Sequence, residues 1–262
     1  MGERISGRVA VVTGGASGIG LGIAQVLAAE GGRVVIADLN LEAAREAADK
    51  ISAGGGTAIA VRADVVQRSD VRGVVEKAVD AFGGIDVWFN NAGYNKPLHL
   101  LDVTEENWRS IMDVNGLGTL IGTQEAALQF IAQGRGGKII NTASMAGRQG
   151  YPSFAPYCAS KAAVISLTQA TARGLAEHDI TCNAFAPGVV DTPLWKKLDR
   201  DLMDIGDSKE PGEAMSSFAE GILRGRPATA SDIAGTALFL ASPDSDYMTG
   251  QVVMIDGGMV LV

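Results

Sequence analysis

The chain has 262 residues, 47% of them apolar, which is enough to bury one large core, so a single domain is expected. The formal net charge of −8 disfavours binding to a nucleic-acid backbone. The charged start at residues 1–8 is unlike a secretory signal, and no apolar run approaches the roughly 18 residues that span a membrane. We therefore expect a cytoplasmic protein. Two cysteines and two histidines are a poor set for disulfides or zinc, so no metal site is predicted.

Short apolar runs rich in β-branched residues alternate with longer amphipathic stretches. The expected strands are residues 8–13, 33–38, 57–63, 85–90, 138–142, 180–186 and 251–255. The expected helices are residues 19–30, 41–51, 69–82, 105–133, 156–177 and 231–241. Parallel strands need crossover helices, and strands covered on both faces are apolar throughout. The sequence therefore predicts an α/β fold, a single-domain Rossmann-like doubly wound sheet of seven parallel strands with helices on both faces.

Residues 188–227 interrupt this alternation, because they form a connection much longer than the few residues usual between a strand and a helix. Long connections of this kind are often lids over a ligand. Leu194, Trp195, Met203 and Met215 could cover such a ligand. The alternative is a pair of surface helices that use these side chains as a small core of their own.

A glycine-rich loop, TGGASGIG at residues 13–20, follows the first expected strand and opens the first expected helix. Glycines let the backbone turn sharply and approach a pyrophosphate, which the helix N-terminus then faces. The spacing differs from G-x-G-x-x-G, and a plain turn is the alternative. We expect the loop to bind a dinucleotide through Gly14, Ser17, Gly18, Ile19 and Gly20.

Asp38 ends the second expected strand, 18 residues after Gly20. A carboxylate at this place accepts hydrogen bonds from the adenosine ribose and repels a 2′-phosphate. Ser17, Leu39 and Asn40 provide no compensating positive charge. The sequence therefore predicts NAD rather than NADP as the cofactor. The alternative is that Asp38 only caps the following helix.

The other strand ends also carry residues suited to a ligand at the carboxyl edge of the sheet. Several of them are expected to contact the cofactor. These are Leu39 after the second strand, Asp64 and Val65 after the third, Asn91, Ala92 and Gly93 after the fourth, and Pro187, Gly188, Val190 and Thr192 after the sixth, together with Tyr157 and Lys161.

Tyr157 and Lys161 lie four residues apart in an expected helix and therefore on one face of it. A phenol titrates near pH 10 and is a poor base at neutral pH, unless a nearby positive charge lowers its pKa. We expect Lys161 to supply that charge and Tyr157 to transfer the proton. Ser144, after the fifth strand, is expected to bind the substrate oxygen as charge develops there.

Together with residues 13–20, 90–93 and 187–188, the Ser144 and Tyr157–Lys161 pattern closely resembles the short-chain dehydrogenase/reductase family over the whole chain. The resemblance implies hydride transfer between the cofactor and a secondary alcohol or ketone. It also implies that Asn115 completes a catalytic tetrad by holding a water in a proton relay with Lys161. From the residues alone, Asn115 marks only a helix irregularity beside two glycines. A silent dinucleotide-binding sensor or scaffold is the alternative, although such a protein would be expected to lose Tyr157 or Lys161.

Residues 136–141, 192–195, 240–251 and 255–260 are similar to acetoin reductases, or meso-2,3-butanediol dehydrogenases, of this family. Residues 134–138, 146–148 and 157–169 are similar to its sorbitol and galactitol dehydrogenases. The resemblance implies a small vicinal diol, hydroxyketone or polyol as substrate. The alternative is a 3-oxoacyl thioester, which Asp38 and Ser17 disfavour because reductases of that kind mostly carry basic residues there.

Aromatic and polar side chains near the expected proton-transfer residues are predicted to line the substrate pocket. Besides Ser144, they are Tyr94, Asn95, Met145, Gln149, Tyr151, Phe154 and Trp195. For each of them, ordinary packing is the alternative.

The chain ends in four apolar residues at 259–262, beside an expected edge strand. Such an end is expected to be covered, and an edge strand is protected when a symmetric partner packs on it. The family resemblance points to the same conclusion. We therefore expect a homotetramer with the carboxyl terminus between subunits; the alternative is that this terminus folds back on its own subunit.

Overall fold

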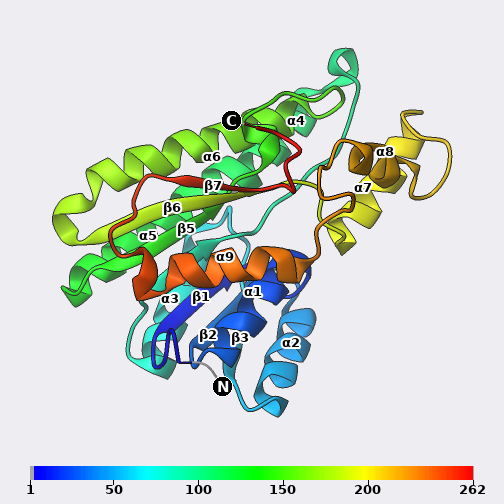
Figure 1. Ribbon diagram of the computed structural model, residues 1–262. Helices are drawn as coiled ribbons and strands as arrows, with labels where there is room; N and C mark the ends of the chain where they lie inside the picture. The colour runs from blue at the N-terminus through cyan, green and yellow to red at the C-terminus, as the bar shows by residue number, and fades with distance from the viewer. Residues whose placement is uncertain (1–2, 262) are drawn as a thin grey trace.

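The computed structural model describes residues 3–261 and contains one sheet of seven parallel strands (Figure 1). The strand order is β3-β2-β1-β4-β5-β6-β7, and each expected strand is present to within two residues. Every residue of the central strands β1 and β4 is buried, as expected for strands covered on both faces. The predicted fold class is therefore confirmed. The strands are β1 Val9–Thr13, β2 Arg33–Asp38, β3 Thr57–Arg62, β4 Val87–Asn90, β5 Gly137–Thr142, β6 Ile180–Pro187 and β7 Val252–Ile255.

Helices cover both faces of the sheet and form two main apolar cores with it (Figure 1). One core contains side chains of α1 (Gly18–Ala29), α2 (Leu41–Ala53) and α9 (Ala230–Ala241). The other contains side chains of α3 (Arg68–Phe82), α5 (Gly118–Gln133) and α6 (Ala155–Gly174). This two-sided burial accounts for the nearly continuous apolar character of the strands and fixes which ends of the strands remain open to a ligand.

The helix expected over residues 105–133 is not uniform. It consists of α4 (Glu105–Met112), a π-helical turn at Asp113–Leu117 and α5. A π turn inserts one extra residue into the helix and redirects the side chains within it. Asn115 lies in this turn and is buried. The irregularity expected at Asn115 is therefore present, and it turns this amide toward the interior.

Two helices occupy the long connection after β6, α7 (Pro193–Asp204) and α8 (Glu213–Glu220). The two ends of this segment meet, because Val190 pairs with Ala228 and the Ala228 N–H donates to the Val189 carbonyl at 2.9 Å. The segment thus begins after β6 and returns to the same place before α9 begins. Short 3₁₀ turns lie at Leu100–Asp102, Met145–Gly147, Ala176–His178 and Pro243–Ser245.

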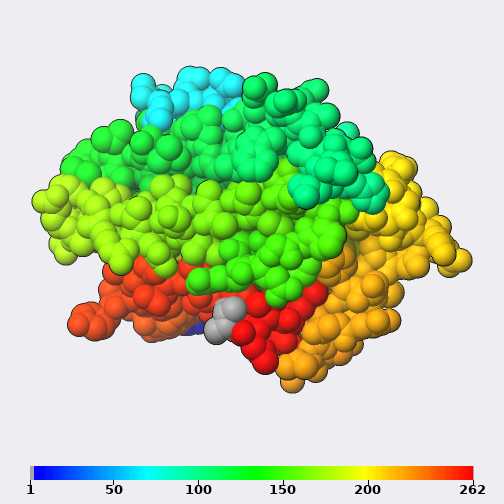
Figure 2. All heavy atoms as spheres, turned by 90° about the horizontal axis from the view of Figure 1, so that it is seen from above, coloured from blue at the N-terminus to red at the C-terminus, as the bar shows by residue number. Residues whose placement is uncertain are grey.

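The carboxyl-terminal segment folds back on its own chain. Met259 and Val260 pack against a cluster that contains Met145 and Ile222, and the Val260 N–H donates to the Asp256 carboxylate at 2.8 Å. In Figure 2 this segment, coloured red, lies against green and orange parts of the chain. Leu261 is 82% exposed. Up to Val260 the structure therefore agrees with the fold-back alternative; Val262 lies outside the described residues.

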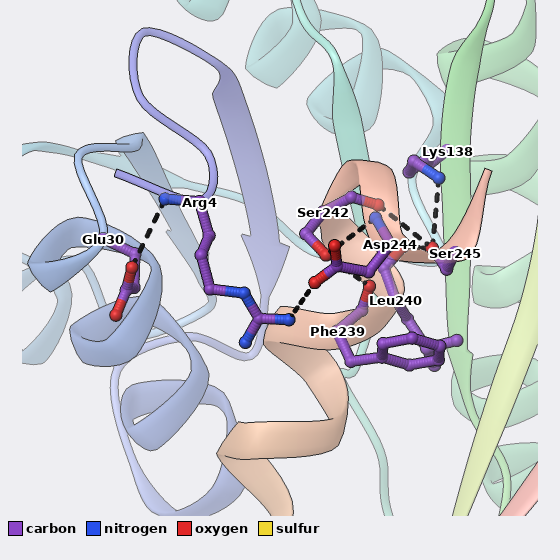
Figure 3. A network of polar contacts seen from close by, with 8 residues as sticks. All are labelled: Arg4, Glu30, Lys138, Phe239, Leu240, Ser242, Asp244 and Ser245. Atoms are coloured by element: carbon purple, nitrogen blue, oxygen red, sulfur yellow. Dashed lines mark hydrogen bonds and ion pairs between the residues drawn. The ribbon is translucent and has the colours of Figure 1, made fainter. Parts of the chain in front are cut away.

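A polar network ties the start of the chain to the turn after α9 (Figure 3). Arg4 forms an ion pair with Asp244, and its backbone N–H donates to Glu30 at 3.3 Å. The buried Lys138 ammonium on β5 donates to Ser245 Oγ at 3.1 Å. This network lies at the amino end of β5, so it fixes the edge of the sheet opposite to the carboxyl ends of the strands.

Both cysteines, Cys158 and Cys182, are free and buried. Within residues 3–261, no helix combines the length and the apolar character needed to cross a bilayer.

Candidate active site

A cavity of about 630 Å³ opens at the carboxyl edge of the sheet. Residues that follow six of the seven strands line it, together with residues of α7 and α8. This convergence is what a parallel sheet provides, because all its strands end at the same edge. The expected cofactor residues all line the cavity: Gly14, Ser17, Gly18, Ile19, Gly20, Asp38, Leu39, Asp64, Val65, Asn91, Ala92, Gly93, Tyr157, Lys161, Pro187, Gly188, Val190 and Thr192.

The glycine-rich loop packs so closely that side chains would not fit. A Cβ at Gly20 would lie 2.2 Å from the Gly14 carbonyl oxygen, and a Cβ at Gly14 would lie 2.8 Å from Ala92 Cα. Gly14 and Gly18 also have positive φ angles of 60° and 53°. The Thr13 hydroxyl accepts hydrogen bonds from the backbone N–H groups of Asn91 at 3.0 Å and Ala92 at 3.1 Å. The loop and the turn after β4 are thus held together as one wall with exposed backbone at the start of α1, a structure that fits a pyrophosphate.

Asp38 does not cap the following helix, because Asn40 is the N-cap of α2 and accepts a hydrogen bond from the Ala43 N–H at 3.2 Å. Instead, the Asp38 carboxylate accepts from the Ala16 N–H at 3.1 Å and from the Asn40 N–H at 3.0 Å. These two bonds fix the carboxylate beside the glycine-rich loop, on the cavity wall. Its remaining lone pairs can accept hydrogen bonds from ribose hydroxyls.

Ser144, Tyr157 and Lys161 all line the same cavity. Ser144 begins the 3₁₀ turn after β5, where its hydroxyl accepts the Ala146 N–H at 3.1 Å. The buried Lys161 ammonium donates to the Thr142 carbonyl at 2.7 Å and lies 5.7 Å from the centroid of the Tyr157 ring. The helical spacing therefore places the amine and the phenol next to each other, as expected.

Burial raises the pKa of the Tyr157 phenol to about 12, and the Ser144 hydroxyl lowers this pKa by less than burial raises it. Burial also lowers the pKa of Lys161 to about 8. The expectation that Lys161 lowers the Tyr157 pKa is therefore wrong. The physical reason is that the Lys161 ammonium bonds to the Thr142 carbonyl, and desolvation of the phenolate dominates. Such a phenol is neutral at pH 7 and suited to donate a proton.

Asn115 does not reach the cavity surface. Its Oδ1 accepts the Tyr94 N–H at 2.8 Å, and its Nδ2 donates to the Tyr94 carbonyl and to Ser160 Oγ, both at 2.9 Å. The Ser160 hydroxyl in turn donates to the Tyr157 carbonyl at 2.7 Å. Asn115 therefore fixes the chain at Tyr94 and, through Ser160, the first turn of α6. Its place in a proton relay stays a prediction.

Most of the residues expected at the substrate pocket line the cavity: Tyr94, Asn95, Ser144, Met145, Tyr151, Phe154 and Trp195. Gln149 does not, and this part of the expectation is wrong. The chain turns at Met145–Gly147, the Gln149 N–H donates to the Met145 carbonyl at 3.1 Å, and the Gln149 side chain is exposed to solvent.

Sequence reasoning missed Leu198 and Phe218, which also line the cavity. Trp195, Leu198 and Leu202 recur on one face of α7, and this apolar period was the available signal. The Trp195 and Phe218 rings lie 5.6 Å apart, edge to face. The two helices thus share an apolar cluster with Phe154 and Tyr157, and do not form a separate core of their own.

Known proteins resemble the chain over nearly its full length. A family model described as enoyl-(acyl carrier protein) reductase matches residues 14–260. A diacetyl reductase [(S)-acetoin forming] of Staphylococcus epidermidis is 41% identical, over 97% of this chain and 98% of the relative. A galactitol 2-dehydrogenase of Agrobacterium fabrum is 43% identical with the same coverage. The crystal structure of a short-chain type dehydrogenase/reductase from Mycobacterium marinum superposes with a TM-score of 0.89 at 36% identity, covering 98% of this chain and 97% of that one.

The chain therefore belongs to the short-chain dehydrogenase/reductase family, and it is an alcohol dehydrogenase or ketone reductase whose cofactor is a nicotinamide dinucleotide. Tyr157 and Lys161 both lie in the cavity, so nothing in the site favours a silent scaffold.

Proposed function

We propose that this protein is an NAD-dependent dehydrogenase that interconverts a small vicinal diol or polyol with the corresponding hydroxyketone, in a single domain. The observation that carries the proposal is one continuous cavity, with the carboxylate of Asp38 and the glycine-rich loop in one part and Ser144, Tyr157 and Lys161 in another. The activities for which the relatives are named, diacetyl reduction and galactitol oxidation, support this substrate class.

In ketone reduction, the neutral Tyr157 phenol donates its proton to the substrate oxygen as negative charge develops there. The Ser144 hydroxyl hydrogen-bonds the same oxygen and stabilises that charge. In alcohol oxidation, the phenolate accepts the proton of the alcohol. When bound, the nicotinamide ring donates or accepts the hydride.

Segment 188–227 is the lid of the cavity in this proposal. Thr192, Trp195 and Leu198 of the segment and Phe218 of its second helix line the cavity, and the two ends of the segment meet at Val190 and Ala228. Ends that converge in this way can act as a hinge for the segment between them.

A substrate panel tests the proposed activity. Acetoin, 2,3-butanediol isomers, sorbitol and galactitol are assayed with NAD(H) by the absorbance of the reduced cofactor, beside acetoacetyl and enoyl thioesters. We expect kcat/KM to be highest for a vicinal diol, hydroxyketone or polyol. Faster reduction of a thioester would replace this substrate class by the acyl thioesters that the description of the family model suggests.

We also propose a homotetramer. Helices α4 and α5 and the π turn between them carry large apolar side chains that face solvent in the single chain: Trp108, Leu117, Leu128 and Ile131. Strand β7 is an edge of the sheet, and Leu261 beyond it is exposed. Further copies of this chain would cover both surfaces symmetrically, one copy on each surface.

Light scattering after size-exclusion chromatography at micromolar concentration is expected to give the mass of four chains. Leu128→Glu combined with Ile131→Glu should reduce this mass to that of two chains or one, because two charges cannot be buried without partners. Leu101→Glu is the control, since Leu101 is also exposed but lies outside these helices. A monomeric wild-type protein would refute the assembly.

A further inference from the structure

Two polar atoms on the cavity wall are buried without a partner. Within the described part of the chain, Asn95 Oδ1 and Trp195 Nε1 are solvent-inaccessible and make no hydrogen bond. Both residues line the cavity that contains Ser144 and Tyr157. Asn95 is only 4% exposed. Buried polar groups nearly always have a hydrogen-bond partner. Two such groups without one beside a ligand cavity therefore point to the ligand as the missing partner.

Asn95 is held in place from both sides. Asn115 binds the backbone of the preceding residue, Tyr94, through two hydrogen bonds of 2.8 and 2.9 Å. Asn107 Nδ2 donates to the carbonyl of the following residue, Lys96, at 3.1 Å. The main chain on both sides of Asn95 is thus fixed by two buried amides. A side chain on such a fixed support is suited to specific recognition.

Trp195 is fixed by its own contacts. Its backbone N–H donates to Thr192 Oγ1 at 3.4 Å, at the start of α7. Its ring packs edge to face on Phe218 at 5.6 Å, so the indole is braced against α8. The indole N–H is only a donor, and the Asn95 oxygen is only an acceptor. A hydroxyl group, which donates and accepts, matches this combination.

We infer that Asn95 and Trp195 bind the second oxygen of the substrate, the hydroxyl next to the reacting carbon. This inference rests on the proposed function, in which Ser144 and Tyr157 bind the reacting oxygen. Met145, Phe154, Leu198 and Phe218 line the same cavity and provide an apolar surrounding. In such a surrounding, a substrate with a single oxygen leaves both groups unpaired and is rejected, whereas a hydroxyketone or diol satisfies them.

The test compares substrates that differ only in the second oxygen, acetoin against 2-butanone and 2,3-butanediol against 2-butanol. Wild-type kcat/KM should favour the dioxygenated member of each pair. Asn95→Leu keeps the size of the side chain and removes its polarity, and it should lower kcat/KM for acetoin by about 10- to 100-fold. The value for 2-butanone should stay within about threefold, since that ketone cannot use the amide. Trp195→Phe keeps a ring without the N–H and should lower the acetoin value by about tenfold.

Ser208→Ala is the control, because Ser208 also has a buried hydroxyl without a partner but does not line the cavity. It should leave the acetoin to 2-butanone ratio unchanged. Asn95→Ser is a second variant in case Asn95→Leu folds poorly. It keeps a small polar group, so its ratio of acetoin to 2-butanone kcat/KM should lie between those of the wild type and Asn95→Leu. Equal losses on both substrates in Asn95→Leu and Trp195→Phe would show a packing role and overturn the inference. A wild-type enzyme that uses both members of a pair equally would overturn it while the proposed function stands; a wild-type enzyme that turns over no vicinal diol, hydroxyketone or polyol overturns both.

Discussion

Tyr157→Phe is expected to lower kcat by about 100- to 10,000-fold in both directions, because the variant has no group that can exchange a proton with the substrate oxygen. Binding of the reduced cofactor should be nearly unchanged, since the phenol oxygen is the only atom removed. Steady-state kinetics gives the first quantity and quenching of protein fluorescence by the reduced cofactor gives the second. Tyr247→Phe is the matched control, because Tyr247 is fully exposed and lies outside the cavity.

The pH dependence gives an independent readout of the same proton transfer. Burial raises the Tyr157 pKa to about 12, so the phenolate needed for alcohol oxidation is scarce at neutral pH, and its fraction grows as the pH rises. Oxidation by the wild-type protein should therefore accelerate with pH. If Tyr157→Phe kept most of its kcat or retained this profile, another residue would transfer the proton.

The protein is expected to use NAD about 100-fold more efficiently than NADP, as measured by kcat/KM for each cofactor. The Asp38 carboxylate is fixed on the cavity wall by the Ala16 and Asn40 N–H groups, and it would lie against a 2′-phosphate. Repulsion together with the loss of the ribose hydrogen bonds accounts for about 2–3 kcal/mol, which corresponds to this ratio.

Two substitutions separate the charge of Asp38 from its bonds to the loop. Asp38→Asn keeps the size and one acceptor oxygen, whereas Asp38→Ala removes the bonds as well. Both substitutions should lower the ratio of kcat/KM with NAD to kcat/KM with NADP. Asp38→Asn should retain more of the activity with NAD than Asp38→Ala. Glu42→Ala removes an exposed carboxylate of α2 that does not line the cavity, so it should leave the ratio unchanged. Equal efficiency of the wild-type protein with NAD and NADP would disprove the assignment.

Local patterns of the chain were sufficient to predict the fold and the cofactor part of the site. Apolar runs bounded by glycine and carboxylate residues identify buried parallel strands, and all such strands must end at one edge of the sheet. Gly14, Asp38 and Asn91 therefore could be placed together before any coordinates were considered. The four-residue spacing of Tyr157 and Lys161 likewise determines that they share a helix face.

The substrate part of the cavity depends on contacts between segments far apart in the sequence. Gln149 and Met145 belong to the same short segment, yet the turn at Met145–Gly147 places only Met145 in the cavity. No periodic pattern predicts such a turn, because it depends on how the turn packs against α6.

The sequence by itself determined the seven parallel strands, their succession along the chain and the edge at which the predicted cofactor and proton-transfer residues meet, because each of these follows from local spacing and the geometry of parallel sheets. Only the tertiary structure decided that burial raises the Tyr157 pKa, that Asn115 binds the backbone of Tyr94, and that the polar atoms of Asn95 and Trp195 lack partners. Desolvation and hydrogen-bond satisfaction depend on every atom within a few ångströms, and those atoms come from strands and helices that no local sequence window contains.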